Sequence, residues 1–144
     1  MGYNGLKKSW IFPGQASQFV GMGKDLFDNT DIGKKYYNLA NDILEVDIQD
    51  ISFNGPEEKL KITKYTQPAI FIVSSVISHL LIENGHVPGC VAGHSLGEYS
   101  ALTAAGGISF ETGLELVKIR SNSMDKAGIT LSLIHISEPT RRLN

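Results

Sequence analysis

One five-residue pattern constrains the fold of this chain more than any other feature. Gly93-His94-Ser95-Leu96-Gly97 follows a short apolar run and precedes a segment with helical spacing. G-x-S-x-G between a strand and a helix is typical of a nucleophile elbow, where glycines let strand and helix approach closely. We expect Ser95 to be a nucleophile on a strained turn and the Leu96 amide to serve an oxyanion hole. The alternative is an ordinary tight turn in which Ser95 only caps the helix.

The order of predicted elements indicates an α/β fold with a short parallel sheet and flanking helices. Ser9–Phe12 is an apolar run that we expect to be a buried strand, and 89–93 is expected to be a short apolar strand. Thr66 is expected to be an N-cap, with Pro68 in the first turn of a long, buried helix. Ser109 is expected to cap the last helix. The expected helices span 25–31, 32–44, 48–54, 66–84, 95–105 and 109–124, with a short polar piece at 57–62.

Composition and charge exclude several classes of protein. Lys and Arg number 13 and Asp and Glu 15, and this net charge of −2 offers no electrostatic footprint for nucleic acid. The single cysteine, Cys90, excludes an internal disulfide and a cysteine-based metal site, and we expect it to be buried. No metal site is expected elsewhere. The most apolar stretch, 69–82, is shorter than the roughly 20 residues of a membrane span. We therefore expect no membrane partner and, without a signal peptide, a cytoplasmic protein.

Four ordered segments resemble the malonyl-CoA:acyl carrier protein transacylases and the wider acyltransferase domains of fatty-acid and polyketide synthases. The resemblance implies part of an α/β-hydrolase-like acyltransferase core, without the ferredoxin-like small subdomain of the family. Ala16 and Ser121 depart from the family, which usually has Gly at both positions. The four segments are FPGQASQ at 12–18, TQPA at 66–69, GHSLGEYSAL at 93–102 and LVKIR at 116–120.

The resemblance also implies a reaction. Ser95 would take a malonyl group from malonyl-CoA as an ester and pass it to the phosphopantetheine thiol of acyl carrier protein. The backbone amides of Gln15 and Leu96 would form the oxyanion hole. From the residues alone, Gln15 would be a turn residue in a Gly-rich loop. No cofactor is implied, because malonyl-CoA is a substrate.

Arg120 matches the family's ligand for the malonyl carboxylate. It borders the apolar stripe of the last helix, and a half-buried guanidinium is well suited to bind a carboxylate through two hydrogen bonds. An internal ion pair or an Arg that extends to solvent would explain the same pattern. The resemblance further implies that Gln67 and His94 contact the substrate, whereas the residues alone fit a helix-start residue and a packing residue. His94 should point away from the Ser95 hydroxyl, which makes it a poor general base.

The end of the chain carries a separate prediction. We interpret 1–130 as the N-terminal part of the catalytic domain and 131–144 as an unrelated tail that resembles translated sequencing-adapter read-through. In the family, the base His lies far downstream of the elbow, and the only His beyond the elbow here is His135. We therefore expect this chain to lack its base and to be nearly inactive alone.

Three other functions fit part of the pattern. A polyketide-type acyltransferase would use the same motifs with a different acyl unit. An α/β-hydrolase esterase explains the elbow but leaves Gln15 and Arg120 without a role, and it would prefer neutral esters. A non-enzymatic module would bind acyl carrier protein without transferring an acyl group.

Overall fold

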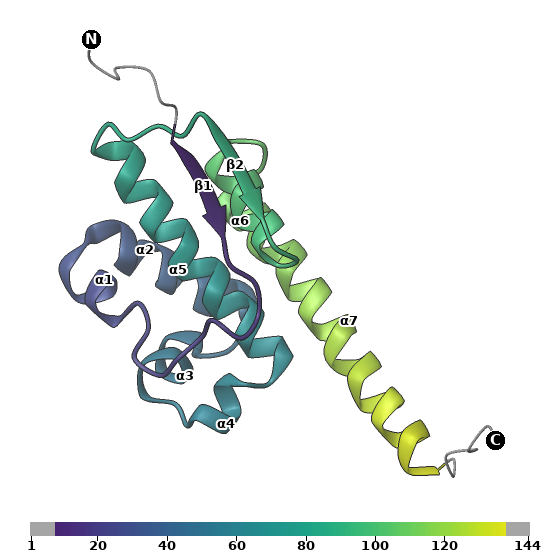
Figure 1. Ribbon diagram of the computed structural model, residues 1–144. Coiled ribbons are helices and arrows are strands. Elements are labelled where there is room, and N and C mark those ends of the chain that lie inside the picture. Colours follow the sequence, from purple (N-terminus) through teal and green to yellow (C-terminus); the bar gives the residue numbers. More distant parts are fainter. Residues whose placement is uncertain (1–7, 138–144) are drawn as a thin grey trace.

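The computed structural model describes residues 8–137, with side chains to residue 129. Within this part the chain is mostly helical, with a two-stranded parallel sheet packed beside the helices (Figure 1). In chain order the elements are β1 (Ser9–Phe12), α1 (Lys24–Asn29), α2 (Asp31–Leu44), α3 (Ile48–Asn54), α4 (Glu57–Leu60), α5 (Thr63–Glu83), β2 (Cys90–Gly93), α6 (Gly97–Ala104) and α7 (Phe110–Ser137).

The register of the sheet brings two distant loops together. β1 and β2 pair in parallel, with Ser9 opposite Cys90 and Phe12 opposite Gly93. Both strands therefore end at the same edge of the sheet. The loop after β1 and the elbow after β2 lie next to each other there, which is where α/β folds place their ligands.

Helix α5 forms the centre of the packed core. Ala69, Phe71, Ile72 and Val76 on this helix are fully buried. Helices α2, α6 and α7 pack around it, and Figure 1 shows α5 alongside the sheet, with α6 directly behind the strands. By length and composition α5 could cross a membrane, but 61% of its apolar window is buried inside the protein. Burial of the apolar side chains of this helix therefore contributes to the hydrophobic stabilisation of the fold.

The prediction that Ser9–Phe12 is a buried strand is wrong. Only Phe12 is buried in β1, whereas Ile11 is 79% exposed. Cys90 is also exposed, contrary to expectation, and its Sγ lies 3.0 Å from the Ser9 hydroxyl. The reason is that an apolar run predicts only a preference for burial, and no described segment covers the outer face of this sheet.

The start of helix α5 also differs from expectation. Helix α5 begins at Thr63 rather than after Thr66, and Thr66 donates its hydroxyl to the Leu60 and Ile62 carbonyls instead of capping. Pro68 consequently lies inside the helix. The Ser109 cap is confirmed, because its hydroxyl accepts from the amide of Thr112 at 3.1 Å.

Helix α7 continues to Ser137, well past the expected end near Met124. The backbone therefore stays helical through Gly128, a residue of low helix propensity but without a close neighbour.

Candidate active site

The turn between β2 and α6 has the strained geometry of a nucleophile elbow. Ser95 has φ 53°, a left-handed value that is uncommon outside glycine. The His94 amide donates to the Phe12 carbonyl at 3.1 Å, and the Gly97 amide donates to the His94 carbonyl at 2.9 Å. These bonds hold the chain on both sides of Ser95. The Ser95 residue itself is exposed, so its hydroxyl is accessible.

The glycines on either side of the elbow are required by the close approach of strand and helix. A Cβ atom on Gly93 would overlap the backbone of Gly97, and one on Gly97 would overlap the Phe12 carbonyl. Backbone atoms cannot move aside as the end of a side chain can. The expected role of both glycines is therefore confirmed.

The loop after β1 lies against the elbow, as an oxyanion hole built from two loops requires. A Cβ on Gly14 would sit 2.8 Å from the His94 carbonyl oxygen and 2.9 Å from its ring Nδ1. Gln15 follows directly, and the Leu96 side chain is fully buried, which anchors the peptide after Ser95. Among the described residues, the Leu96 amide has no acceptor. The oxyanion roles of Gln15 and Leu96 stay predictions.

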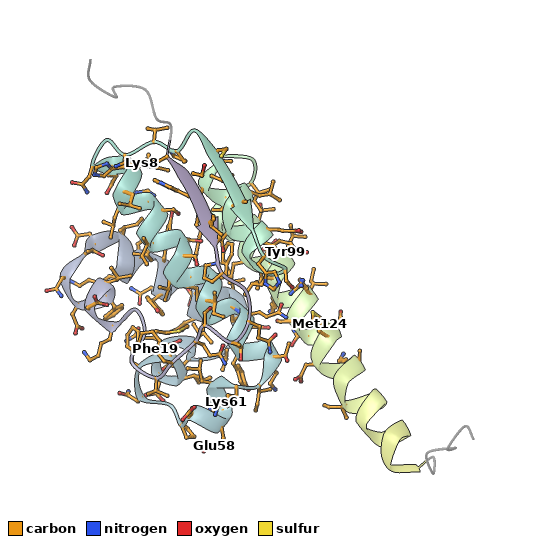
Figure 2. The ribbon with its side chains drawn as sticks, in the orientation of Figure 1. Lys8, Phe19, Glu58, Lys61, Tyr99 and Met124 are labelled. Atoms are coloured by element: carbon orange, nitrogen blue, oxygen red, sulfur yellow. The ribbon has the colours of Figure 1, made fainter. Side chains whose placement is uncertain are left out.

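Arg120 reaches the nucleophile from α7. Its Nη2 donates to Ser95 Oγ at 2.8 Å, and its Nη1 donates to Gln67 Oε1 at 2.6 Å. The guanidinium carbon lies 5.9 Å from the centre of the Tyr99 ring, and Figure 2 shows Tyr99 beside α7. Hydrogen bonds thus join Gln67, Ser95 and Arg120, which are far apart in the chain.

No carboxylate neutralises this cation within the described part of the chain. The ion pairs found there involve other residues, such as Lys118 with Glu45 at 3.2 Å. The internal ion pair that was an alternative for Arg120 is therefore not formed. A half-buried guanidinium without an anionic partner favours an anionic ligand.

Gln67 links this cation to the loop after β1. Its side chain is buried, and its Nε2 lies 3.3 Å from Met124 Sδ and 3.4 Å from Gln15 Oε1. Gln15 in turn donates to the Thr63 hydroxyl at 3.2 Å. Sequence reasoning missed Thr63, Tyr99 and Met124, because neither spacing nor residue type indicates that they border the site.

None of the His side chains that the structure describes is placed as a base for Ser95. The His94 residue is exposed, and its ring lies beside Gly14. His79 is 3.2 Å from both the Tyr36 hydroxyl and the Glu83 carboxylate, in a cluster of its own. The side chain of His135 lies outside the described residues.

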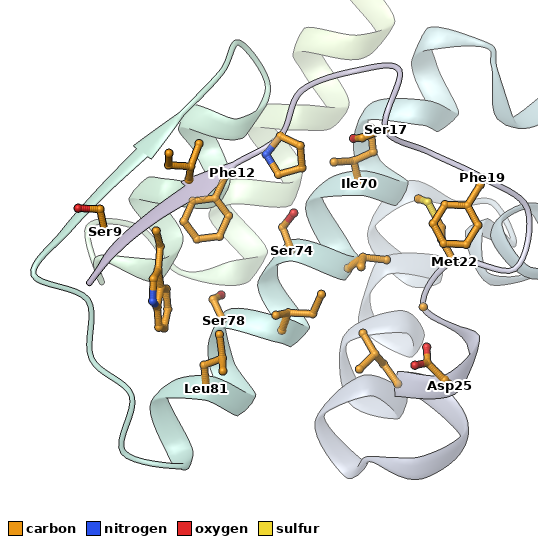
Figure 3. Close-up of a pocket in the computed structure, with 17 residues that line it drawn as sticks. Ser9, Phe12, Ser17, Phe19, Met22, Asp25, Ile70, Ser74, Ser78 and Leu81 are labelled. Carbon is orange, nitrogen blue, oxygen red and sulfur yellow. The ribbon is translucent and has the colours of Figure 1, made fainter. Parts of the chain in front are cut away.

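An apolar hollow elsewhere in the described structure is separate from this site. A cavity of about 610 Å³ lies between β1, α1 and α5, and Figure 3 shows Phe12, Phe19 and Ile70 around it. Neither Ser95 nor Arg120 lines it. Among the described residues, no three His, Cys, Asp or Glu side chains gather as a metal site.

Comparison with known proteins agrees with this geometry. Residues 9–130 match the acyl transferase domain family, and because this is most of the chain, the chain belongs to that family. Within it, the chain is a homologue of the malonyl CoA-acyl carrier protein transacylases. It is 48% identical over 122 residues to the malonyl CoA-acyl carrier protein transacylase of Synechocystis, covering 85% of this chain and 41% of that protein.

Two solved structures show the same arrangement of the backbone. The crystal structure of the Synechocystis malonyl-CoA:ACP transacylase matches with a TM-score of 0.81, over 85% of this chain and 41% of that one. A chain from the structure of a type II polyketide acyl-carrier protein in complex with its malonyl-transacylase matches with a TM-score of 0.79 and 40% identity. The match covers 85% of this chain and 40% of that one. The chain thus spans about two fifths of the length of these relatives.

Proposed function

We propose that this chain carries the nucleophile and the carboxylate-binding cation of an acyl carrier protein S-malonyltransferase. The observation that supports this most directly is the 2.8 Å hydrogen bond from Arg120 to Ser95 Oγ. In a malonyl thioester the carboxylate is one methylene away from the carbonyl that is attacked. A cation that selects malonyl groups must therefore lie beside the nucleophile, and a guanidinium binds a carboxylate through two parallel hydrogen bonds.

The proposed reaction has two transfers. Ser95 Oγ attacks the thioester carbonyl of malonyl-CoA and gives up its proton to a base, and the C–S bond breaks as the coenzyme A thiol leaves with a proton. The thiol of phosphopantetheine on acyl carrier protein then attacks the malonyl-serine ester. The C–O bond breaks, and Ser95 recovers its proton. The Leu96 and Gln15 amides would stabilise the oxyanion of both steps, each by about 3 kcal/mol.

We infer that this chain needs a base supplied by residues outside the described part. The support is that the Ser95 hydroxyl is hydrogen-bonded to the side chain of Arg120, which is a cation and cannot accept a proton. Without a base, attack by the hydroxyl loses a factor of roughly 10² to 10⁴. Acylation of the chain by malonyl-CoA should therefore be slow.

Binding of malonyl-CoA and acetyl-CoA tests the proposal. We expect the chain to bind malonyl-CoA more tightly, and Arg120→Ala to remove this preference, a loss of about tenfold or more. Lys118→Ala on the same helix, whose side chain contacts Ile43 and Glu45 instead, is the matched control. Equal affinity of the unmodified chain for both thioesters, measured by titration calorimetry, would contradict the proposal.

Labelling by radioactive malonyl-CoA tests the inference about the base. We expect slow labelling that Ser95→Ala abolishes. Rapid, stoichiometric labelling of the unmodified chain would show that its own residues supply the base.

A polyketide-type acyltransferase is the second candidate. One of the similar structures is a malonyl-transacylase with a type II polyketide acyl-carrier protein. The site geometry is the same for both candidates, so the carrier protein that the complete enzyme accepts distinguishes them.

A further inference from the structure

Gln67 is buried in the centre of the hydrogen-bond network around Ser95. It is 1% exposed, although Gln residues are mostly found at the surface. Its Oε1 accepts from Arg120 Nη1 at 2.6 Å, and its Nε2 faces Met124 Sδ at 3.3 Å and Gln15 Oε1 at 3.4 Å. Both ends of the amide side chain are thus turned toward protein groups.

The guanidinium is planar, so fixing one of its nitrogens sets the direction of the other. Gln67 holds Nη1, and Nη2 then points at Ser95 Oγ, 2.8 Å away. An amide oxygen is also neutral. It orders the cation without cancelling the charge that a carboxylate ligand needs, whereas an acidic residue at this position would form an ion pair with it.

We propose that Gln67 is a positioning residue for the cation of the acyl site. Its buried amide orients Arg120 toward the nucleophile and leaves the positive charge available to the carboxylate of the acyl group. This deepens the proposed function and rests on it. It also replaces the expectation that Gln67 itself binds the substrate, because its side chain acts through Arg120.

Two variants of the full chain separate orientation from charge. Gln67→Met has a similar length but no acceptor for Nη1. Gln67→Glu keeps the acceptor in place but adds a negative charge. Gln49→Met on α3 makes the same chemical change outside this hydrogen-bond network and is the control.

The first measurement is the NMR signal of the Arg120 side-chain Nη groups, identified by its loss in Arg120→Lys. We expect slow rotation of this guanidinium in the unmodified chain, in Gln67→Glu and in the control. In Gln67→Met the rotation should become fast, because one of the two hydrogen bonds is gone. If Gln67 only supported the fold, the rotation of the Arg120 guanidinium would not differ between Gln67→Met and Gln67→Glu.

The second measurement is the affinity for malonyl-CoA relative to acetyl-CoA. We expect Gln67→Met to weaken malonyl-CoA binding by about tenfold, since a hydrogen bond to a charged group is lost, and to leave acetyl-CoA binding unchanged. Gln67→Glu should weaken malonyl-CoA binding at least as much, although its guanidinium stays ordered.

The outcomes are distinct. Slow rotation and an unchanged malonyl preference in Gln67→Met would overturn the proposal. If Gln67→Met does not fold, Gln67→Glu decides: an unchanged malonyl preference in that variant would overturn it. If the unmodified chain does not distinguish the two thioesters, the proposed function fails, whereas the NMR comparison still tests whether Gln67 orients Arg120.

Discussion

At the scale of single residues, two side-chain-bearing positions near the site have left-handed backbone conformations. Ser95 has φ 53° and Ala16 has φ 84°. The strain at Ser95 presents the hydroxyl, as the elbow pattern predicted. Ala16 lies next to Gln15, and its amide is held by the Gln18 side chain at 2.9 Å. A left-handed conformation costs a non-glycine residue about 1–2 kcal/mol, so Ala16 is strained at a position where the family resemblance implies glycine.

We expect Ala16→Gly to leave the free energy of unfolding unchanged or to raise it by up to about 1 kcal/mol. Relief of the left-handed strain offsets the greater chain entropy of glycine in the unfolded state. Urea denaturation measures the difference. Ala127→Gly, in the exposed part of helix α7, should instead cost about 1 kcal/mol. A loss at Ala16 as large as that at Ala127 would show that the loop is not strained there.

At the scale of elements, the junction of β1, β2 and α6 determines where the nucleophile stands. Gly97 is the first residue of α6, and its missing side chain lets the helix start directly against the Phe12 carbonyl. Helices α5 and α7 then bring Gln67 and Arg120 to the same place. The site therefore depends on backbone contact at the strand ends and on helix packing behind it.

Gly97→Ala should lower the free energy of unfolding by about 2–3 kcal/mol, because the added methyl group meets backbone that cannot move aside. Gly128→Ala is the matched control. That position lies in helix α7 with no atom within 4 Å of an added Cβ, so the change should stabilise the chain by about 0.5–1 kcal/mol. Thermal unfolding followed by circular dichroism compares the two. Similar effects at both positions would contradict the tight junction.

The packing of α2 predicts a dependence on alkaline pH. Tyr37 is fully buried between Phe27 and Phe53, and burial together with the nearby Asp25 raises its pKa above the ordinary value of 10.0. Above pH 10 the unfolded chain loses the phenol proton while the folded chain keeps it. The free energy of unfolding should therefore fall as the pH rises beyond 10.

Tyr37→Phe should reduce this alkaline destabilisation and cost about 1 kcal/mol at neutral pH, where the hydroxyl donates to the Met22 carbonyl. Urea denaturation at pH 8 and pH 11 measures both effects. An identical pH dependence in the variant would mean that other groups cause the loss.

At the scale of the whole molecule, one side of the sheet and part of α7 are uncovered. In Figure 1 the end of α7 extends beyond the other helices. On α7, Ile119 is 65% and Ile129 is 57% exposed, and Ile11 on β1 is 79% exposed. The chain spans about two fifths of the length of its relatives, and within the described residues these apolar side chains face solvent.

Two neighbours on β1 test how the sheet contributes to stability. Ile11→Thr should change the free energy of unfolding by less than about 0.5 kcal/mol, because Ile11 is exposed. Phe12→Ala should cost about 3–5 kcal/mol, because Phe12 is only 6% exposed and packs against the cavity beside α5. Urea denaturation of both variants measures this contrast. A large cost at Ile11 would mean that its side chain is covered in solution.

The elbow, the order of the elements, most helix positions and the family could be read from the sequence, because they depend on local sterics, capping and motif spacing. The strained Ser95, the two required glycines and the Ser109 cap are examples. Only the tertiary structure decided which strand residues are buried, where α5 begins, and that Gln67 contacts Arg120 rather than solvent. Burial and hydrogen-bond partners are set by segments that are distant in the chain, and no local pattern specifies how those segments pack.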